Sequence, residues 1–587
     1  MRIGRRTFIA AAAAVGLLAA GCSGGGSSGG GASGDGYGGT LRVASVGEID
    51  ALDPLIAYSS ESWQVIRALT RQLVTYPGSP ESIGADTEIV PDLAESWEVS
   101  PDGLTYTFTL RDGIKFSGAT DREITAHDFV YAIKRFPDPN AQVSAITYYN
   151  ALLEGFREYA DEFAKVPTGD LKAAKEFIDT HEISGVTALD DKTLQLKLTQ
   201  PASDFLDILT LNFVSPLPEE IVSNYFADSL EFRQNYASSG PYYIESYEQG
   251  KQLRLKKVPD YNGEGDPRHA YVDEIVFDTT VASADAASQQ LQTGTADIGL
   301  YVRAYPANVI AQYKKTDPDH LHISPSGSAV FISWNNPEQP TTDGQRALKD
   351  LRVRQAFNYA LDKADIVRGL GGPDAAIVSN EILTSTIVGY TGENPYPTPD
   401  DKGDPDKARA LLAEAGHPDL TLNLVYRNNP EYEKIATSVQ NAAKRAGIDV
   451  RITPIPGDSW GALNAFLSDK SKLDEWDLAI TTWTPDWQGN SARMTLGGWL
   501  DSEFAPGGTW NGVTYHNPEL NAVVRKAFAA QDPTADWQQA NRIATRDLAW
   551  FPLVERVKSV PTSDRVTNWT WQSLGNGADI TNIAVTG

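Results

Sequence analysis

The chain contains a single cysteine, Cys22, and its surroundings predict that this thiol carries a lipid. An apolar run over residues 8–20 ends in small residues just before it, and Arg5 and Arg6 precede the run. A basic segment, a short apolar segment and small residues at a cut site are typical of an export signal. The run is too short to cross a bilayer as a helix. We therefore expect cleavage after residue 21 and acylation of Cys22; an ordinary secretory signal with an unmodified thiol is the alternative.

Two features of this leader leave the export route open. Arg5 and Arg6, followed by Thr7 and Phe8, resemble a twin-arginine signal, which would export the protein already folded. The preferred lipoprotein pattern has leucine three residues before the cysteine, where this chain has Ala19. Because no second cysteine exists, an intramolecular disulfide is impossible, and the exported body must be held together by its core.

Motifs for catalysis or metal binding are weak. Residues 21–25 fit the G-x-S-x-G pattern of hydrolases, but they lie in a Gly/Ser-rich stretch with no strand and helix around them. His320 and His322 have no clear third ligand, and the aspartates of residues 400–406 lack EF-hand spacing. Carboxylates are so abundant that no pair stands out for acid–base work, and no phosphate-binding glycine loop is found. We therefore predict no enzyme activity, no cofactor and no metal, with an exported hydrolase as a remote alternative.

Composition sets further limits. The 587 residues carry 50 basic and 77 acidic side chains, a net charge of -27. This balance opposes binding to nucleic acid and to anionic membranes, although a soluble surface explains it equally well. The length predicts several lobes. Thirteen Trp and 24 Tyr suit aromatic-lined cavities as well as an ordinary core.

Periodicity indicates the elements that would position a site. Residues 104–110 alternate apolar side chains with threonines, which predicts a half-buried strand, and Asp112-Gly113 predicts a hairpin with residues 114–116. Thr125 is a candidate helix cap. A strand at 420–426, a helix at 432–446 and a strand at 450–454 predict an α/β lobe. The remaining patterns predict strands at 41–46, 194–198 and 253–256, and helices at 62–74, 353–361 and 408–415.

Several short blocks, in a fixed order, resemble one known family. They are Pro91–Trp97, Ser100–Arg111, Thr125–Val130, Gly240–Tyr242, Val272–Ile275, Thr293–Asp297, Leu351–Ala356 and Trp476–Trp483. The chain is thereby identified as a member of the peptide-type extracellular solute-binding proteins of ABC importers, bacterial family 5. The resemblance runs from about Leu41 to about Pro552.

The resemblance implies a two-lobed α/β fold of the periplasmic-binding-protein type (type II, cluster C), with an extra subdomain in lobe I. The chain would cross between the lobes near Gly327 and near Trp550, and such hinges close over a ligand. The expected organisation is a signal peptide at 1–21, a tether at 22–39, lobe I at 40–80, 199–326 and 551–587, its subdomain at 81–198, and lobe II at 327–550.

The same resemblance nominates binding residues. Asp486 directly follows an apolar strand, and the matching aspartate in peptide-binding relatives holds the ligand's α-ammonium; a surface turn is the alternative, because Pro-Asp is ordinary loop chemistry. Trp483 and Trp487 would wall the pocket, or belong to the core. The other candidates are Thr484, Trp460, Tyr58, Ser59 and Ser328. Where some oligopeptide binders carry an arginine for the ligand carboxylate, this chain has Ile480, so either another cation takes that role or the ligand has no free carboxylate there.

The expected function is therefore that of a receptor of an ABC importer, which captures oligopeptides or similar small solutes between its lobes. The permease and the ATPase would be separate chains, the lipid on Cys22 would anchor the protein outside the cell membrane, and the protein is expected to be a monomer that binds no nucleic acid. Oligosaccharides or other solutes remain an alternative, because aromatic walls also stack on sugar rings. A binding lipoprotein that takes no part in import is a third possibility.

Overall fold

The computed structural model describes residues 38–141, 143, 145–500 and 515–586. The predicted export signal, Cys22 and the tether up to residue 37 lie outside these residues. Within the described ranges, no helix combines the length and the apolar character that a membrane span requires. The strands of these ranges form three sheets of four or more strands and three two-stranded ones.

A five-stranded sheet contains the first strand of the fold, in the order β10-β11-β12-β1-β13. β1 lies parallel to both β12 and β13; β11 continues the sheet antiparallel to β12, and β10 is antiparallel to β11. The alternating burial of β1 fits a strand with one face on the core. The bounds are β1 Thr40–Ser45, β10 Tyr242–Glu248, β11 Gln252–Lys257, β12 Glu274–Asp278 and β13 Ile298–Leu300.

A four-stranded antiparallel sheet has the order β4-β5-β8-β7, with β4 Ala94–Val99, β5 Thr105–Leu110, β7 Val186–Asp190 and β8 Thr193–Lys197. The predicted strand at 104–110 is confirmed as β5, but its predicted hairpin with residues 114–116 is wrong. β4 and β8 occupy both edges of β5. Ile114 and Phe116 bury in the core instead, and Lys115 makes only an isolated bridge to Glu123.

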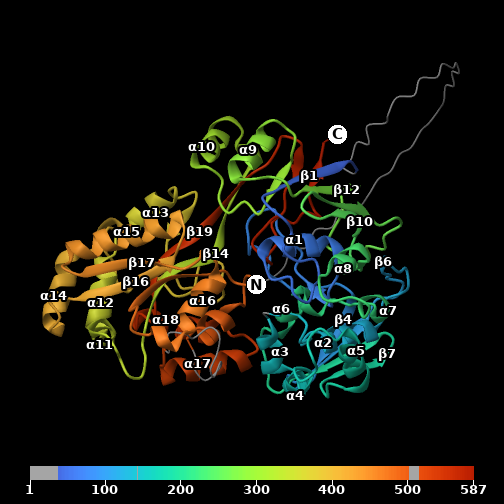
Figure 1. The fold of residues 1–587 in the computed structure, drawn as a ribbon, viewed down its shortest axis with the longest axis horizontal. Helices are drawn as coiled ribbons and strands as arrows, with labels where there is room; N and C mark the ends of the chain where they lie inside the picture. Colours follow the sequence, from blue (N-terminus) through green and yellow to red (C-terminus); the bar gives the residue numbers. More distant parts are fainter. Residues whose placement is uncertain (1–37, 142, 144, 501–514, 587) are drawn as a thin grey trace, which may run out of the picture. The chain divides into compact units, whose positions relative to one another are not determined.

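The third large sheet has six strands in the order β15-β19-β14-β18-β16-β17. The predicted strand–helix–strand unit is confirmed as β16, α15 and β17, with the two strands parallel. From β17 the chain returns through α16 to β18 on the other side of β16, so right-handed crossovers place α15 and α16 on opposite faces of the sheet (Figure 1). The bounds are β14 Leu321–Trp334, β15 Ala376–Val378, β16 Thr421–Arg427, α15 Pro430–Arg445, β17 Asp449–Ile455, α16 Trp460–Ser468, β18 Leu478–Trp483 and β19 Phe551–Pro561.

The two longest strands, β14 and β19, pair with each other in two stretches. Residues 321–325 pair with 557–561, and residues 329–332 pair with 551–555, with a bulge between them. Gly327 lies in the bulge at a φ of +70°, a conformation that glycine adopts without strain. Gly327 and Trp550, near which the lobe crossings are predicted, lie at this bulge and immediately before β19.

The remaining strands and helices complete the fold around these sheets. Thr125 caps α2 through a capping box with Asp128, as predicted. The helix predicted at 62–74 is shorter, because Thr70 is already extended and ends α1. These elements are α1 Ser60–Leu69, β2 Val74–Thr75, β3 Val90–Pro91, β6 Ser117–Gly118, α2 Ala126–Arg135, α3 Ile146–Leu152, α4 Phe156–Phe163, α5 Leu171–Thr180, α6 Phe205–Leu209, α7 Glu219–Val222, α8 Leu230–Gln234, β9 Ala237–Ser238, α9 Ala284–Gln292, α10 Ala307–Thr316, α11 Asp343–Leu348, α12 Leu351–Ala360, α13 Lys363–Leu370, α14 Pro405–Ala415, α17 Pro518–Ala529, α18 Thr534–Arg546, β20 Val566–Asn568 and β21 Ala584–Val585.

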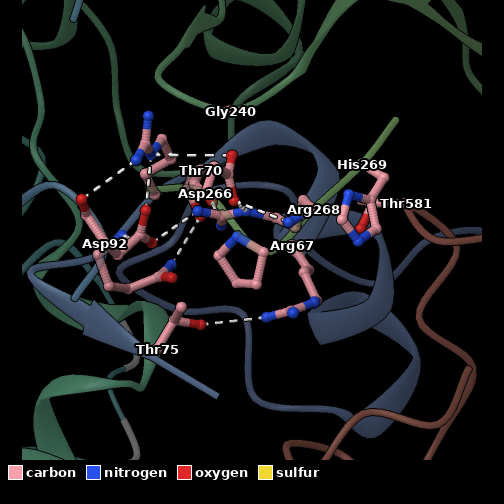
Figure 2. A network of polar contacts seen from close by, with 12 residues as sticks. Arg67, Thr70, Thr75, Asp92, Gly240, Asp266, Arg268, His269 and Thr581 are labelled. Carbon is pink, nitrogen blue, oxygen red and sulfur yellow. Dashed lines mark hydrogen bonds and ion pairs between the residues drawn. The ribbon is translucent and has the colours of Figure 1, made fainter. Parts of the chain in front are cut away.

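A buried network of ion pairs follows α1 and joins segments far apart in the sequence (Figure 2). The Asp92 carboxylate accepts from Arg71 Nε and from Arg268 Nη2, each at 2.6 Å. Asp266 pairs with Arg268 as well, and the side chains of all four residues are 0% exposed. Burial opposes ionisation of Asp266, but Arg268 and Arg71 hold its pKa below the usual value. The network therefore binds together the chain around residues 71, 92 and 266 without a disulfide.

Candidate ligand-binding site

A cavity of about 560 Å³ opens where the end of β18 faces the start of α1. This volume lies within the range of small-molecule binding sites. Three further segments contribute to the wall, namely the loop before α3, α3 itself and the first residue of α16. The lining residues are Tyr58, Ser60, Trp63, Val143, Ile146, Thr147, Trp460, Thr482, Trp483, Thr484, Pro485 and Asp486.

Asp486 is the only charged side chain among the described residues that line this cavity. β18 is a buried central strand that ends at Trp483, and the next three residues carry the chain into the cavity. The Asp486 side chain is buried, and both of its oxygens accept from Tyr58 Oη at 3.0 Å. Tyr148 Oη donates to Oδ2 at 2.6 Å. The surface-turn alternative for Asp486 is therefore wrong.

Burial controls the protonation of this group. Desolvation raises the pKa of Asp486 to about 6, although the hydrogen bonds from Tyr148 and Tyr58 favour the charged form. Burial and the neighbouring carboxylate raise the pKa of both tyrosines well above the usual value, so their hydroxyls stay protonated and act as donors. At neutral pH the cavity thus holds one negative charge.

That charge has no counter-ion in the part of the chain that the structure describes. Among the described residues, no lysine, arginine or histidine nitrogen lies within 4.0 Å of the Asp486 carboxylate. Two tyrosine hydroxyls solvate it only in part, because an ionised carboxylate offers about four acceptor positions. A buried and unneutralised carboxylate is suited to a cationic group of a ligand.

Four of the other predicted residues line the same cavity. Trp483 and Thr484 follow Thr482 at the end of β18, and Trp460 begins α16. Tyr58 lies just before α1, where its ring contacts Trp63 edge-on at 5.7 Å. The structure thus brings together residues that are more than 400 positions apart in the chain, as the bond between Tyr58 and Asp486 shows.

Three predicted residues occupy positions around the cavity rather than on its wall. Ser59 caps α1 by accepting from the Ser62 amide, and it donates to Asp50. Trp487 is buried, and its ring packs against Tyr148 at 5.5 Å. Ser328 shares a hydrogen bond of 2.9 Å with Thr484, and both line a second cavity. Their proposed contact with a ligand remains a prediction.

No pattern in the sequence predicted α3. Tyr148, Ile146 and Thr147 come from this seven-residue helix, which has no side-chain cap. Tyr148 makes the shortest bond to Asp486. Two adjacent tyrosines in Ile146–Tyr149 were the available signal, but aromatic residues in so short a helix are equally typical of a core.

The second cavity, of about 750 Å³, shares Ser60 and Thr484 with the first. Arg427, at the end of β16, lines it and is only 8% exposed. Its Nη2 donates to Tyr432 Oη and, at 2.9 Å, to Thr482 Oγ1, whereas its Nε has no hydrogen-bond partner among the described residues. Burial, followed by the charges of Arg556 and Arg303, lowers the pKa of Arg427 to about 10. Arg427 therefore remains a cation at neutral pH, close to the strand that leads to Asp486.

The residues considered earlier for a metal do not form a cluster. In the described part of the chain, no three histidine, cysteine, aspartate or glutamate side chains are placed to hold a metal ion. His322 stacks on Trp569 at 4.2 Å, and burial lowers its pKa to about 4. His320 instead pairs with Asp317.

Comparison with known proteins agrees with this architecture. The family described as bacterial extracellular solute-binding proteins, family 5 Middle, matches residues 88–501. The probable D,D-dipeptide-binding periplasmic protein DdpA of Escherichia coli (strain K12) is 25% identical over 540 residues, 91% of this chain and 92% of that protein. Heme-binding protein A of Haemophilus influenzae is 28% identical over 515 residues, covering 84% and 83% of the two chains.

A solved structure shows the same fold. The clavulanic acid biosynthesis oligopeptide binding protein 2 superposes with a TM-score of 0.79 at 25% identity, covering 94% of this chain and 96% of the other. The predicted two-lobed α/β fold is thereby confirmed, as is the resemblance inferred from the short sequence blocks. The chain belongs to family 5 of the bacterial extracellular solute-binding proteins.

Proposed function

We propose that this protein is the substrate-binding component of an ABC importer and that it captures short peptides with free ends. The observation that carries this proposal is the buried Asp486 carboxylate, which has no counter-ion among the described residues. A ligand ammonium would supply the missing charge through a charge-assisted hydrogen bond. Peptide-binding names among the relatives support the same class of ligand.

Arg427 is the cation that we propose for the other end of the peptide. Some oligopeptide binders have an arginine at the position of Ile480. Here Ile480 is an uncharged residue, fully buried in β18 opposite Ile332, and it cannot bind a carboxylate. Arg427 instead lines the second cavity, and its buried Nε has no hydrogen-bond partner among the described residues. A guanidinium binds a carboxylate through two parallel hydrogen bonds, which suits a peptide C-terminus.

The spacing of the two charges favours short ligands. Arg427 reaches Thr482, and Asp486 lies four residues further along the chain. Four residues span at most about 14 Å, which is also the length of about four extended peptide residues. The ladder between β16 and β18 ends at Val425 and Ala479, so the last residues of β18 have no β16 partner in the described ladder. We propose that the peptide backbone pairs with this free edge.

Other ligand classes fit the site less well. Of the residue types that ligate haem iron, histidine, cysteine and methionine line neither cavity among the described residues; tyrosines do, but Tyr58 is already bonded to Asp486 and Tyr432 to Arg427. An oligosaccharide could stack on Trp63, Trp460 and Trp483, but a neutral sugar would leave Asp486 without a counter-ion. The protein itself is proposed to perform no catalysis.

The cellular setting is proposed from the sequence. Cys22 would carry the lipid that anchors the protein at the outer face of the membrane. The permease and the ATPase would be separate chains, and the protein would act as a monomer. Mass spectrometry of the mature protein would test the lipid directly, since acylation adds a large and defined mass to the N-terminal peptide.

Calorimetry with end-blocked peptides tests the proposed ligand. We expect a free tripeptide such as Ala-Ala-Ala to bind, because its two charged ends meet Asp486 and Arg427. Acetylation of the amine or amidation of the carboxylate should each weaken binding by about 100-fold, since each leaves one buried charge unpaired. Equal affinity for the free and the N-acetylated peptide would refute the proposed role of Asp486.

The pH dependence of binding follows from the same carboxylate. Because the pKa of Asp486 is raised to about 6, affinity for a free tripeptide should be constant above pH 7 and fall about tenfold per pH unit below 6. Protonation removes the charge that the ammonium requires. Isothermal titration between pH 8 and 5 measures this slope, and a flat profile would contradict the prediction.

A further inference from the structure

The second cavity carries more positive charge than one peptide terminus can neutralise. The described residues that line it include six basic side chains and three acidic ones, a difference of three positive charges in a chain whose net charge is -27. The basic residues are Arg303, Lys314, Arg427, Lys434, Arg556 and Lys558, and the acidic ones are Glu61, Asp374 and Glu431.

Internal ion pairs account for only part of this charge. Lys314 pairs with Asp374, and Arg556 pairs with Glu431. For the other four bases, no carboxylate oxygen of the described residues lies within 4.0 Å, and Glu61 is likewise unpaired. The excess therefore resides on Arg303, Arg427, Lys434 and Lys558.

Position and charge connect four of these six bases. Arg556 and Lys558 are two residues apart on β19, so their side chains leave the same face of the strand. Arg303 lies in the segment before α10, and its charge acts together with that of Arg556 on Arg427. Arg427 is buried under this repulsion with its Nε unpartnered. An anion in the cavity would relieve the repulsion, because it adds an opposite charge where the bases converge.

We propose that the second cavity selects acidic peptides, that is, ligands with at least one carboxylate beyond the C-terminal one. This inference rests on the proposed function, in which Arg427 receives the terminal carboxylate. Arg303, Lys434 and Lys558 then remain, and we assign Arg303 and Lys558 to an aspartate or glutamate side chain of the peptide. A lysine side chain placed beside Arg303 and Lys558 is disfavoured by their like charge.

A charge series of tripeptides tests this selectivity. We expect Ala-Ala-Glu to bind about tenfold more tightly than Ala-Ala-Ala, and Ala-Ala-Lys about tenfold more weakly, in calorimetry at low salt. In the variant Arg303→Ala/Lys558→Ala the three affinities should converge on that for Ala-Ala-Ala. The affinity for Ala-Ala-Ala itself should change less than threefold, because neither residue meets its termini.

A matched control separates local charge from net charge. Lys315→Ala/Lys444→Ala also removes two positive charges, but from exposed positions that do not line the cavity. This variant should keep the preference for Ala-Ala-Glu. Equal wild-type affinities for Ala-Ala-Glu and Ala-Ala-Ala would overturn the inference while leaving the proposed function intact, and so would a preference that survives in Arg303→Ala/Lys558→Ala. Failure of all three peptides to bind would refute the proposed function, and this inference with it.

Discussion

Asp486→Asn is expected to weaken the binding of a free tripeptide by at least about 100-fold and to leave the protein as stable as before, or more so. Asparagine fits the same space and can still accept from Tyr58 and Tyr148, so the packing is retained. Only the charge that faces the ligand's ammonium is lost, and the partner of a buried charge contributes about 2–5 kcal/mol. Calorimetry measures the affinity, and thermal unfolding measures the stability.

The direction of the stability change follows from the raised pKa. Asp486 binds protons more readily in the folded protein than in the unfolded chain, so its burial penalises folding above pH 6, and the penalty disappears as the pH falls towards the ordinary value of 3.8. The difference corresponds to about 3 kcal/mol at neutral pH. Asp486→Asn removes this penalty, so a strongly lowered melting temperature would indicate a structural role instead.

Asp207→Asn provides a matched control for this variant. Asp207 is also buried, accepts from a tyrosine, Tyr76, and has its pKa raised mainly by desolvation. It lines neither cavity. We expect the Asp207→Asn variant to bind the tripeptide with the affinity of the wild type. An equal loss in both variants would mean that any buried aspartate produces the effect, which would contradict a contact between Asp486 and the ligand.

Asp92→Ala is expected to lower the free energy of unfolding by about 3–5 kcal/mol. Asp92 accepts from Arg71, Arg268 and the Gln72 amide, and its removal leaves two fully buried guanidinium groups with Asp266 as their only carboxylate in the described network. Breaking a buried ion pair from one side is strongly destabilising, because the remaining charge has no water to solvate it. Chemical denaturation followed by tryptophan fluorescence measures the change.

Asp343→Ala is the control for this variant. Asp343 pairs with Arg346 at the surface, where its side chain is 97% exposed, and solvent screening makes such a pair weak. No measurable change in stability is expected. Because Asp92 lies outside both cavities, the folded Asp92→Ala protein should bind the tripeptide with wild-type affinity. A loss of affinity without a loss of stability would contradict a purely structural role.

Local periodicity was a reliable guide where an element is regular. The strand at 104–110 and the β16–α15–β17 unit were predicted because one face of each is buried, and burial leaves a period of two or 3.6 in the sequence. The predicted hairpin at 112–116 was wrong because a Gly-containing turn does not show which strand will pair with the edge of β5. β8, some 80 residues further on, took that place.

The proposed binding site was only half predictable. Asp486, Trp483 and Trp460 were nominated because they resemble positions of known binding proteins, whereas Arg427 was not singled out, and the adjacent tyrosines that include Tyr148 are equally typical of a core. Their roles arise from long-range contacts, such as the bond from Tyr148 to a residue 338 positions away. Neither composition nor spacing contains such a contact. The charge excess of the second cavity is hidden for the same reason, since its bases come from four separate segments.

The opposite charges of the two adjoining cavities give the site a direction. A peptide that enters the wrong way round would place its ammonium among the bases and its carboxylate beside Asp486, and both contacts are repulsive. Under the proposed function, every bound peptide would therefore settle in one orientation. Two isomers of identical composition but reversed order would then bind differently, so that the site would distinguish the order of residues as well as their chemistry.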